Sequence, residues 1–297
     1  MKLKEPVFKG SCTAMITPFT EEGIDYDRME KLLERQISGG TQAVVIAGTT
    51  GEIPALKDRE YESLAVFSVQ KAAGRMKVIL GIGGNNTEKC LENAAFARDI
   101  GADAVLMTPP YYNKTSPDGL AEHFLYVADR VDIPMILYNV PSRTAVGIPA
   151  AVYKRLAAHP NVNGVKEASG DFSLIAELAS DCYGDLWLWS GNDDHTIPMM
   201  ALGALGVISV ASNLVPKTVA ELCHACLSCD FEAANALYRR CSALFRMLFV
   251  ETNPIPVKAA MAMRALDSGL LRRPLVPLSA SHKAAMCYLL LRCESLD

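Results

Sequence analysis

The stretch PMILYNVPSRTAVGIPAAVYKRLAAHPNVNGVKE, residues 134–167, places a longer amphipathic segment between two short runs. The first run, PMILYNV, is apolar apart from Asn139, as is typical of a strand that is covered on both faces. The segment that follows is long enough for a helix, and the second run, NVNGVKE, has the length of another strand. Strand, helix and strand in this order form the repeating unit of a parallel sheet.

The same unit recurs along the chain. Short runs of strand type alternate with helix-like segments, and the eight runs begin at Ser11, Gln42, Lys77, Asp103, Pro134, Asn161, Leu186 and Gly206. Eight strand–helix pairs make up a (β/α)₈ barrel, in which helices cover the outside of the strands and side chains fill the inside. The sequence therefore predicts an α/β fold of the TIM-barrel class.

Capping residues support the helices expected between the runs. Thr87 is expected to cap the start of one helix and Gly101 to end it, while Ser116 opens the next. The pairs end near Cys229. We therefore expect residues 1–229 to form the catalytic barrel, and residues 230–297 to form a C-terminal helical appendage that packs on its outside.

Composition and charge narrow the class of protein. Half of the residues are hydrophobic and 21% are charged, which is typical of a globular protein with a large core. The formal net charge is −4 and the basic residues are scattered, so we expect no nucleic-acid partner. Neither a signal peptide nor a membrane-length apolar stretch is evident, which predicts a cytoplasmic protein that binds small molecules and no membrane.

The nine cysteines are read as reduced thiols. Cys223, Cys226 and Cys229 lie close together in CHACLSC, with His224 beside them, and could ligate zinc or an iron–sulfur cluster. Metal sites of this kind usually lie on turns rich in glycine or proline, whereas this run has a helical pattern. Packing in the core explains the spacing equally well, and we expect no metal site.

The ends of the strands are where a barrel of this class builds its active site. Several predicted strands end in polar, chemically versatile segments: AGTTGE, TPPYYN, LYNVPSRT, GVKEASG, SGNDD and ISVASN. The segment GIGGNN, residues 81–86, is read as a tight turn, since it lacks the lysine and spacing of a phosphate-binding loop.

Lys166 ends a strand-type run, where its amine is expected to point into the barrel mouth. Desolvation disfavours the ammonium form, so a free amine becomes available to attack a carbonyl and form a Schiff base. A structural lysine in a salt bridge, with the adjacent Glu167 as a helper, is the alternative, and position alone does not separate the two. Lys258, in the tail, is expected to be a solvated helix residue.

Three other strand ends offer side chains for a keto acid. Thr49 and Thr50 lie in a glycine-flanked loop whose hydroxyl and backbone N–H groups could converge on a carboxylate, although an ordinary turn has the same pattern. Tyr138 could pass protons to a reacting oxygen, and Arg143 could bind a carboxylate with two parallel hydrogen bonds. Alternatively, Tyr138 fills the barrel and Arg143 lies on the surface.

In this order, the segments GTTGE, PPYYN, YNVPSRT, VKEASG and NPIPVK resemble those of the dihydrodipicolinate synthases, and the resemblance covers essentially the whole chain. A wider group of pyruvate-dependent enzymes, with N-acetylneuraminate lyase and the keto-deoxy-sugar-acid aldolases, is similar in the GxxGE loop, the YN pair and the lysine. Arg143 favours the synthases, because the sugar-acid lyases generally lack an arginine there.

The resemblance implies roles for individual residues. Lys166 would form the imine with pyruvate, Thr49 and Thr50 would hold its carboxylate, and Gly191 and Ile208 would line the same pocket.

The resemblance also implies a second set of roles. Tyr138 and Thr49 would form a proton relay with Tyr112 of a neighbouring subunit, and Arg143 would bind the carboxylate of L-aspartate 4-semialdehyde. Members of the family use no metal and no organic cofactor, and they are usually homotetramers built as pairs of tight dimers.

The reaction implied is the condensation of pyruvate with L-aspartate 4-semialdehyde to 4-hydroxy-tetrahydrodipicolinate, on the route to diaminopimelate and lysine. An N-acetylneuraminate or 2-keto-3-deoxy sugar acid lyase of the same group is the alternative. A barrel that only senses a keto acid would leave the lysine, tyrosines and threonines without a common purpose.

Inhibition by L-lysine, found in many members of the family, is expected to be weak here. The positions that would contact the effector are Asp58, Tyr61, Asn85, Lys89 and Tyr111. Lys89 stands where a glutamate is expected, and it would repel the ammonium of the effector. Asp58 could partly compensate for this repulsion.

Overall fold

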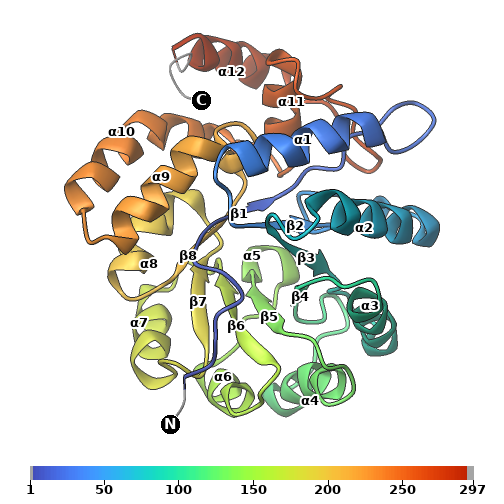
Figure 1. Cartoon of the computed structure of the whole chain (residues 1–297), viewed down its shortest axis with the longest axis vertical. Coiled ribbons are helices and arrows are strands. Elements are labelled where there is room, and N and C mark those ends of the chain that lie inside the picture. Colours follow the sequence, from blue (N-terminus) through green and yellow to red (C-terminus); the bar gives the residue numbers. More distant parts are fainter. Residues whose placement is uncertain (1–2, 293–297) are drawn as a thin grey trace.

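The computed structural model describes residues 3–292. Eight parallel strands close into a barrel in the order of the sequence, with helices around them (Figure 1). The strands are β1 (Gly10–Ala14), β2 (Ala43–Ile46), β3 (Lys77–Gly81), β4 (Ala104–Met107), β5 (Met135–Asn139), β6 (Val162–Glu167), β7 (Trp187–Ser190) and β8 (Gly206–Ser209). All eight predicted strands and the predicted TIM-barrel fold are therefore confirmed.

Helices connect the strands and cover their outer face. Those of the barrel are α1 (Tyr26–Ser38), α2 (Asp58–Ala72), α3 (Thr87–Asp99), α4 (Pro117–Ala128), α5 (Pro141–Thr144), α6 (Ala150–Ala157), α7 (Phe172–Asp181), α8 (Thr196–Ala201) and α9 (Pro216–Leu227). Short 3₁₀ turns follow three of the strands: η1 (Ile53–Ala55), η2 (Asp193–His195) and η3 (Ala211–Asn213).

Strand burial explains why the apolar runs are continuous. Every strand residue except Lys77 is buried, because one strand face meets the helices and the other meets the barrel interior. The interior holds a separate apolar cluster that includes Ile136, Tyr138, Trp189 and Ile208.

The capping predictions are confirmed in part. Ser116 caps α4 by accepting a hydrogen bond from the N–H of Gly119 at 3.2 Å, and Gly101 follows the end of α3 in the left-handed conformation. The prediction for Thr87 is wrong by one residue. Asn86 caps α3, because its carboxamide oxygen accepts from two N–H groups of the first turn, while the Thr87 hydroxyl lies 2.8 Å from His123 Nδ1.

The N-terminal arm closes the end of the barrel at which the strands begin. Phe8 stacks on Trp189 inside the barrel, with 4.9 Å between ring centroids. The Lys4 ammonium donates to the backbone oxygens of Ala157, His159 and Val162 at 2.7, 2.7 and 2.8 Å. Because side chains fill this end, a ligand can reach the barrel interior only from the carboxyl ends of the strands.

The C-terminal segment adds three helices, α10 (Phe231–Met247), α11 (Ile255–Met263) and α12 (Ala280–Arg292). The first packs against α9, and the other two pack against each other on the side of the barrel where α1 lies (Figure 1). No helix within residues 3–292 has the length and apolar character needed to span a membrane.

Candidate active site

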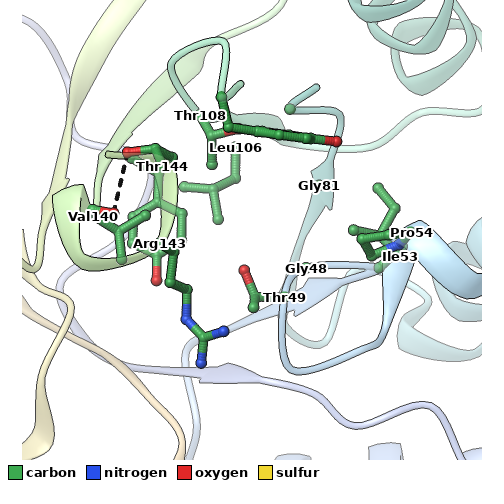
Figure 2. Close-up of a pocket in the computed structure, with 14 residues that line it drawn as sticks. Gly48, Thr49, Ile53, Pro54, Gly81, Leu106, Thr108, Val140, Arg143 and Thr144 are labelled. Atoms are coloured by element: carbon green, nitrogen blue, oxygen red, sulfur yellow. Dashed lines mark hydrogen bonds between the residues drawn. The ribbon is translucent and has the colours of Figure 1, made fainter. Parts of the chain in front are cut away.

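Two adjoining cavities open at the carboxyl ends of the strands. The first is lined by Ala47, Gly48, Thr49, Ile53, Pro54, Gly81, Gly83, Leu106, Thr108, Tyr111, Tyr138, Val140, Arg143 and Thr144 (Figure 2). The second is lined by Thr50, Tyr138, Val140, Ser142, Arg143, Lys166, Ala168, Gly191, Asn192, Val210 and the five residues Phe249, Val250, Glu251, Thr252 and Asn253. Tyr138, Val140 and Arg143 belong to both, so they form the boundary between the cavities.

Lys166 lies near the end of β6 and lines the second cavity. Its side chain is almost wholly buried, and its Nζ lies 4.1 Å from the centroid of the Tyr138 ring on the neighbouring strand β5. Within the described part of the chain, the amine makes no hydrogen bond or ion pair. A buried amine without a counter-charge, facing a cavity, is suited to attack a carbonyl.

Glu167 points away from Lys166, because successive side chains of a strand face opposite sides of the sheet. Its carboxylate accepts hydrogen bonds from Asn139 Nδ2 at 2.8 Å, from the Tyr153 hydroxyl at 3.1 Å and from the backbone N–H of Ser169 at 2.7 Å. Burial and this carboxylate raise the pKa of Tyr153 well above its ordinary value, which keeps the phenol a donor. The alternative in which Glu167 pairs with Lys166 is therefore wrong.

The loop after β2 brings two hydroxyls to the mouth of the barrel, with Thr49 in the first cavity and Thr50 in the second. The backbone N–H groups of Gly51 and Glu52 donate to the backbone oxygens of Gly48 and Thr49, respectively, at 3.1 Å each. Those of Thr49 and Thr50 have no acceptor among residues 3–292. Two adjacent unpaired N–H groups beside two hydroxyls can bind a carboxylate.

Thr50 also contacts the C-terminal segment. Its Oγ1 accepts a hydrogen bond from Asn253 Nδ2 at 2.9 Å, and both side chains are buried. Since this oxygen is an acceptor in that contact, the hydroxyl hydrogen remains available to a ligand in the second cavity. The prediction did not include Asn253, although it begins the segment NPIPVK that carried part of the family resemblance.

Arg143 lies on the short helix α5, which begins at Pro141. Figure 2 shows its guanidinium extending into the same cavity as Thr49, and shows the hydrogen bond from Thr144 Oγ1 to the Val140 carbonyl, 3.1 Å long, at the base of this helix. One guanidinium nitrogen donates to the backbone oxygen of Asn253 at 3.2 Å. The remaining N–H groups are available to a carboxylate.

Two glycines at the mouth are required by close packing. A Cβ on Gly191 would lie 2.6 Å from that of Ala168, and a Cβ on Gly81 would lie 2.2 Å from the carbonyl oxygen of Ala47. Gly191 lines the second cavity as expected. Ile208, in contrast, is fully buried in the barrel interior and lines neither cavity.

The two tyrosines after β4 differ in their surroundings. Tyr111 lines the first cavity. Tyr112 is 92% exposed, lines neither cavity of its own chain, and has a φ of +69°. The left-handed region costs a non-glycine residue about 1–2 kcal/mol. The loop thus holds this ring out in solvent in an unfavourable backbone conformation.

The positions expected to contact L-lysine lie on α2 (Asp58 and Tyr61), on α3 (Lys89), in the loop before α3 (Asn85) and in the loop after β4 (Tyr111). Lys89 Nζ lies 3.5 Å from Asp58 Oδ2 and 3.5 Å from Glu92 Oε2. Tyr61 is buried, and burial raises the pKa of its phenol, whose hydroxyl has no partner among the described residues. The Asn85 backbone oxygen accepts from Asn113 Nδ2 at 2.8 Å.

The prediction for Lys258 is wrong. The side chain is fully buried, and its Nζ lies 2.8 Å from Glu52 Oε1 and 2.8 Å from the backbone oxygen of Thr17. Burial lowers the pKa of Lys258 from its ordinary value, and the Glu52 carboxylate opposes that shift. The partner is 206 residues away in the sequence, so local pattern could not reveal it.

The cysteine run contributes to packing. Cys223 and Cys226 are buried on α9, and Cys229 is exposed just beyond the end of the helix. Among residues 3–292, no three His, Cys, Asp or Glu side chains are grouped so that they could hold a metal ion.

Comparisons with known proteins agree with this geometry. Residues 7–291 match the Dihydrodipicolinate synthetase family. The chain is 47% identical over 275 residues to the 4-hydroxy-tetrahydrodipicolinate synthase of Thermoanaerobacter sp. (strain X514), a match that covers 92% of this chain and 93% of that one. It superposes on the crystal structure of dihydrodipicolinate synthase from Aquifex aeolicus with a TM-score of 0.95, 43% identity, and coverage of 97% of this chain and 99% of that one. A similar structure, described as the first monomeric dihydrodipicolinate synthase variant, gives a TM-score of 0.94 at 38% identity and covers 98% of each chain.

Proposed function

Because the chain belongs to the dihydrodipicolinate synthetase family, we propose that Lys166 binds pyruvate as a Schiff base and that the resulting enamine is joined to L-aspartate 4-semialdehyde. The activity is that of a 4-hydroxy-tetrahydrodipicolinate synthase, a lyase of lysine and diaminopimelate biosynthesis. The observation that carries the proposal is the buried Lys166 amine, which has no counter-charge in residues 3–292 and faces a cavity that Arg143 and Thr50 also line.

The chemistry begins with the Lys166 amine. It attacks the keto carbon of pyruvate, and loss of water gives the imine. The imine is a better electron sink than the ketone, so the methyl group loses a proton and an enamine forms. The enamine carbon then attacks the aldehyde carbon of the second substrate, whose oxygen takes up a proton. Finally, the substrate amine displaces Lys166 and closes the ring, which frees the lysine.

We propose that the Thr49–Thr50 loop binds the pyruvate carboxylate. The unpaired N–H groups of this loop and the free hydroxyl hydrogen of Thr50 support this role, as does the position of Thr50 on the cavity of Lys166. Gly191 would leave room for the substrate beside Ala168. A role for Ile208 stays a prediction from the family resemblance.

Arg143 is proposed to bind the carboxylate of L-aspartate 4-semialdehyde. Its exposed position on the boundary between the cavities supports a contact with the second substrate, which arrives after pyruvate is bound. Tyr138, whose ring lies beside the amine, is proposed to move protons together with Thr49 and with Tyr112 of a neighbouring subunit.

The proposal includes a homotetramer in the cytoplasm. The exposed ring of Tyr112, held in a left-handed backbone conformation, supports a role outside its own chain. A related synthase exists as a monomeric variant, so activity must be measured together with assembly state. Light scattering at assay concentration, on the wild type and on folded monomeric interface variants, makes that test, and a fully active monomer would refute the shared site.

A substrate panel tests the activity itself. Purified protein is assayed with pyruvate and L-aspartate 4-semialdehyde, and separately for cleavage of N-acetylneuraminate and of 2-keto-3-deoxy sugar acids. We expect turnover of the first pair alone. Cleavage of a sugar acid without the condensation would favour the alternative lyase. Pyruvate trapping by borohydride with no turnover of any substrate would favour a keto-acid sensor.

A further inference from the structure

We propose that Asn253 and Lys258, in the segment between α10 and the middle of α11, are positioning residues for the pyruvate-binding loop and set the affinity for pyruvate. The inference rests on the proposed function of the Thr49–Thr50 loop. Neither side chain is expected to touch the reacting atoms. Each is instead bonded to a residue of the loop GTTGE, residues 48–52, across the boundary between the barrel and the C-terminal helices.

The first contact is made by Asn253. Its Nδ2 donates to Thr50 Oγ1 at 2.9 Å, while its own backbone oxygen accepts from Arg143 at 3.2 Å. Asn253 thus contacts both Thr50, which is assigned to pyruvate, and Arg143, which is assigned to the second substrate. Removal of the carboxamide would leave the Thr50 hydroxyl free to rotate and the loop free to shift toward the space vacated.

The second contact is made by Lys258. Its ammonium donates to Glu52 Oε1 at 2.8 Å, and the other oxygen of that carboxylate accepts from the backbone N–H of Arg272 at 2.9 Å. Both carboxylate oxygens of Glu52 are therefore bonded to the C-terminal segment. Glu52 has a φ of +57°, a region that is unfavourable for a side chain other than glycine. Contacts that fix the carboxylate can hold this backbone conformation, and with it the preceding loop residues.

The Lys258 ammonium is also connected to the loop indirectly, through Thr17. Lys258 Nζ donates to the Thr17 backbone oxygen at 2.8 Å, and the Thr17 hydroxyl donates to the Gly51 carbonyl at 2.7 Å. The ring of Phe19 lies beside this group, 4.2 Å from Lys258 Nζ and 4.3 Å from the guanidinium carbon of Arg272. The loop is thereby tied on both sides of Gly51, while the N–H groups of Thr49 and Thr50 stay unpaired within residues 3–292.

This arrangement has a specific consequence for kinetics. The N–H groups that would bind the pyruvate carboxylate belong to the loop that Asn253 and Lys258 hold, whereas Lys166 lies on β6 and is outside this network. Loss of the support should therefore weaken pyruvate binding more than it slows turnover at saturating pyruvate. A purely structural role would lower stability without this selectivity.

The experiment measures the pyruvate concentration that gives half-maximal borohydride-trapped adduct, using full-length protein and mass spectrometry. The variants are Asn253→Ala, which leaves no buried charge unpaired, and the double variant Glu52→Gln with Lys258→Met, which removes both charges together. Met261→Ala is the matched control, because Met261 is fully buried on the same helix and its apolar side chain donates no hydrogen bond to the loop. Urea unfolding of each variant reports stability.

We expect the half-saturating pyruvate concentration to rise about tenfold or more in both test variants, since small displacements of binding groups have large effects. The KM for L-aspartate 4-semialdehyde in the double variant should change little, and Met261→Ala should lose stability with normal pyruvate binding. If the half-saturating pyruvate concentration of Asn253→Ala stays within about twofold of the wild-type value, this inference is wrong but the proposed function is unaffected. An equal rise in Met261→Ala has the same meaning. A wild type that forms no adduct overturns the proposed function instead.

Discussion

Two buried lysines, Lys166 at the barrel mouth and Lys258 behind the loop after β2, have similar surroundings but different partners. Each ammonium nitrogen lies close to an aromatic ring, at 4.1 Å from the centroid of Tyr138 and 4.2 Å from that of Phe19. Lys258 has a carboxylate and a backbone oxygen at 2.8 Å, whereas Lys166 has neither in the described residues and faces a cavity. Burial is thus common to both, and pairing distinguishes them.

The difference follows from the cost of burying a charge. A buried ammonium is tolerated when a carboxylate and further hydrogen bonds compensate for lost hydration, as around Lys258. Lys166 has no such partners among residues 3–292, and its amine faces the second cavity, where it can attack a bound carbonyl compound as a nucleophile. The comparison teaches that a buried lysine with a complete set of partners supports the fold, and one without partners, facing a cavity, is a candidate for chemistry.

The largest expected effect is on catalysis at the unpaired lysine. Lys166→Arg should lower kcat by about 10⁴-fold or more, since a guanidinium stays protonated and cannot form the imine. Mass spectrometry after borohydride reduction should detect no pyruvate adduct, and circular dichroism should show an unchanged fold. An adduct retained in this variant would falsify the assignment of Lys166.

For stability, we expect replacement of Lys258 to have a larger effect than replacement of Lys166. Lys258→Met leaves Glu52 buried without its counter-charge and should cost about 3–5 kcal/mol of unfolding free energy. Lys166→Met removes no ion pair, and its cost should stay within about 1 kcal/mol. Urea unfolding at matched protein concentration measures both. Equal losses in the two variants would show that pairing does not separate these lysines.

Arg143 lines both cavities, and its replacement tests whether it serves the second substrate. Arg143→Ala should raise the KM for L-aspartate 4-semialdehyde roughly ten- to a hundredfold, the equivalent of about 1.5–3 kcal/mol for a charge-assisted contact. Pyruvate trapping should change much less. If both substrates lose equally, the hydrogen bond to the Asn253 backbone is its main role, and Arg143 is structural.

A third lysine, exposed and paired with surface carboxylates, should give the smallest effect. Lys89 lies 3.5 Å from Asp58, so we expect weak inhibition of the wild type by L-lysine and stronger inhibition of Lys89→Glu. The gain should be about tenfold or less, because exposed charges interact by about 1 kcal/mol at most. Initial rates against L-lysine concentration measure it, with Lys9→Glu, an exposed lysine before β1, as control. Strong sub-millimolar inhibition of the wild type would contradict this expectation.

The barrel fold and the position of Lys166 near the end of β6 could be predicted from the sequence, because local patterns of apolar residues determine both. A strand covered on both faces, such as β5, requires a continuous apolar run, and the carboxyl end of such a strand must lie at the mouth. Position on β6 therefore sufficed to bring Lys166 to a cavity. The same reasoning predicted that Thr49 and Tyr138 lie at the mouth of the barrel, and both line the first cavity.

Contacts between distant segments could not be predicted in this way. The side chains of Lys258 and Asn253 bond to Glu52 and Thr50, which are 206 and 203 residues away in the sequence. The alternative for Lys166 failed for a related reason, because the Glu167 side chain bonds to Asn139 on β5, Tyr153 on α6 and the Ser169 N–H rather than to Lys166. A chemical group's position follows from local sequence, whereas its partners depend on the whole fold.

The separation between Glu52 and Lys258 also sets an order of events on the ribosome. Chains are made from the N-terminus and begin to fold during synthesis. The last strand, β8, ends at Ser209, so all eight strands are made before Lys258 is added. Until then the Glu52 carboxylate has no ammonium to bind. The loop after β2 therefore cannot complete its contacts with Lys258 and Arg272 until the C-terminal segment has been made, so its final form is reached only late in synthesis.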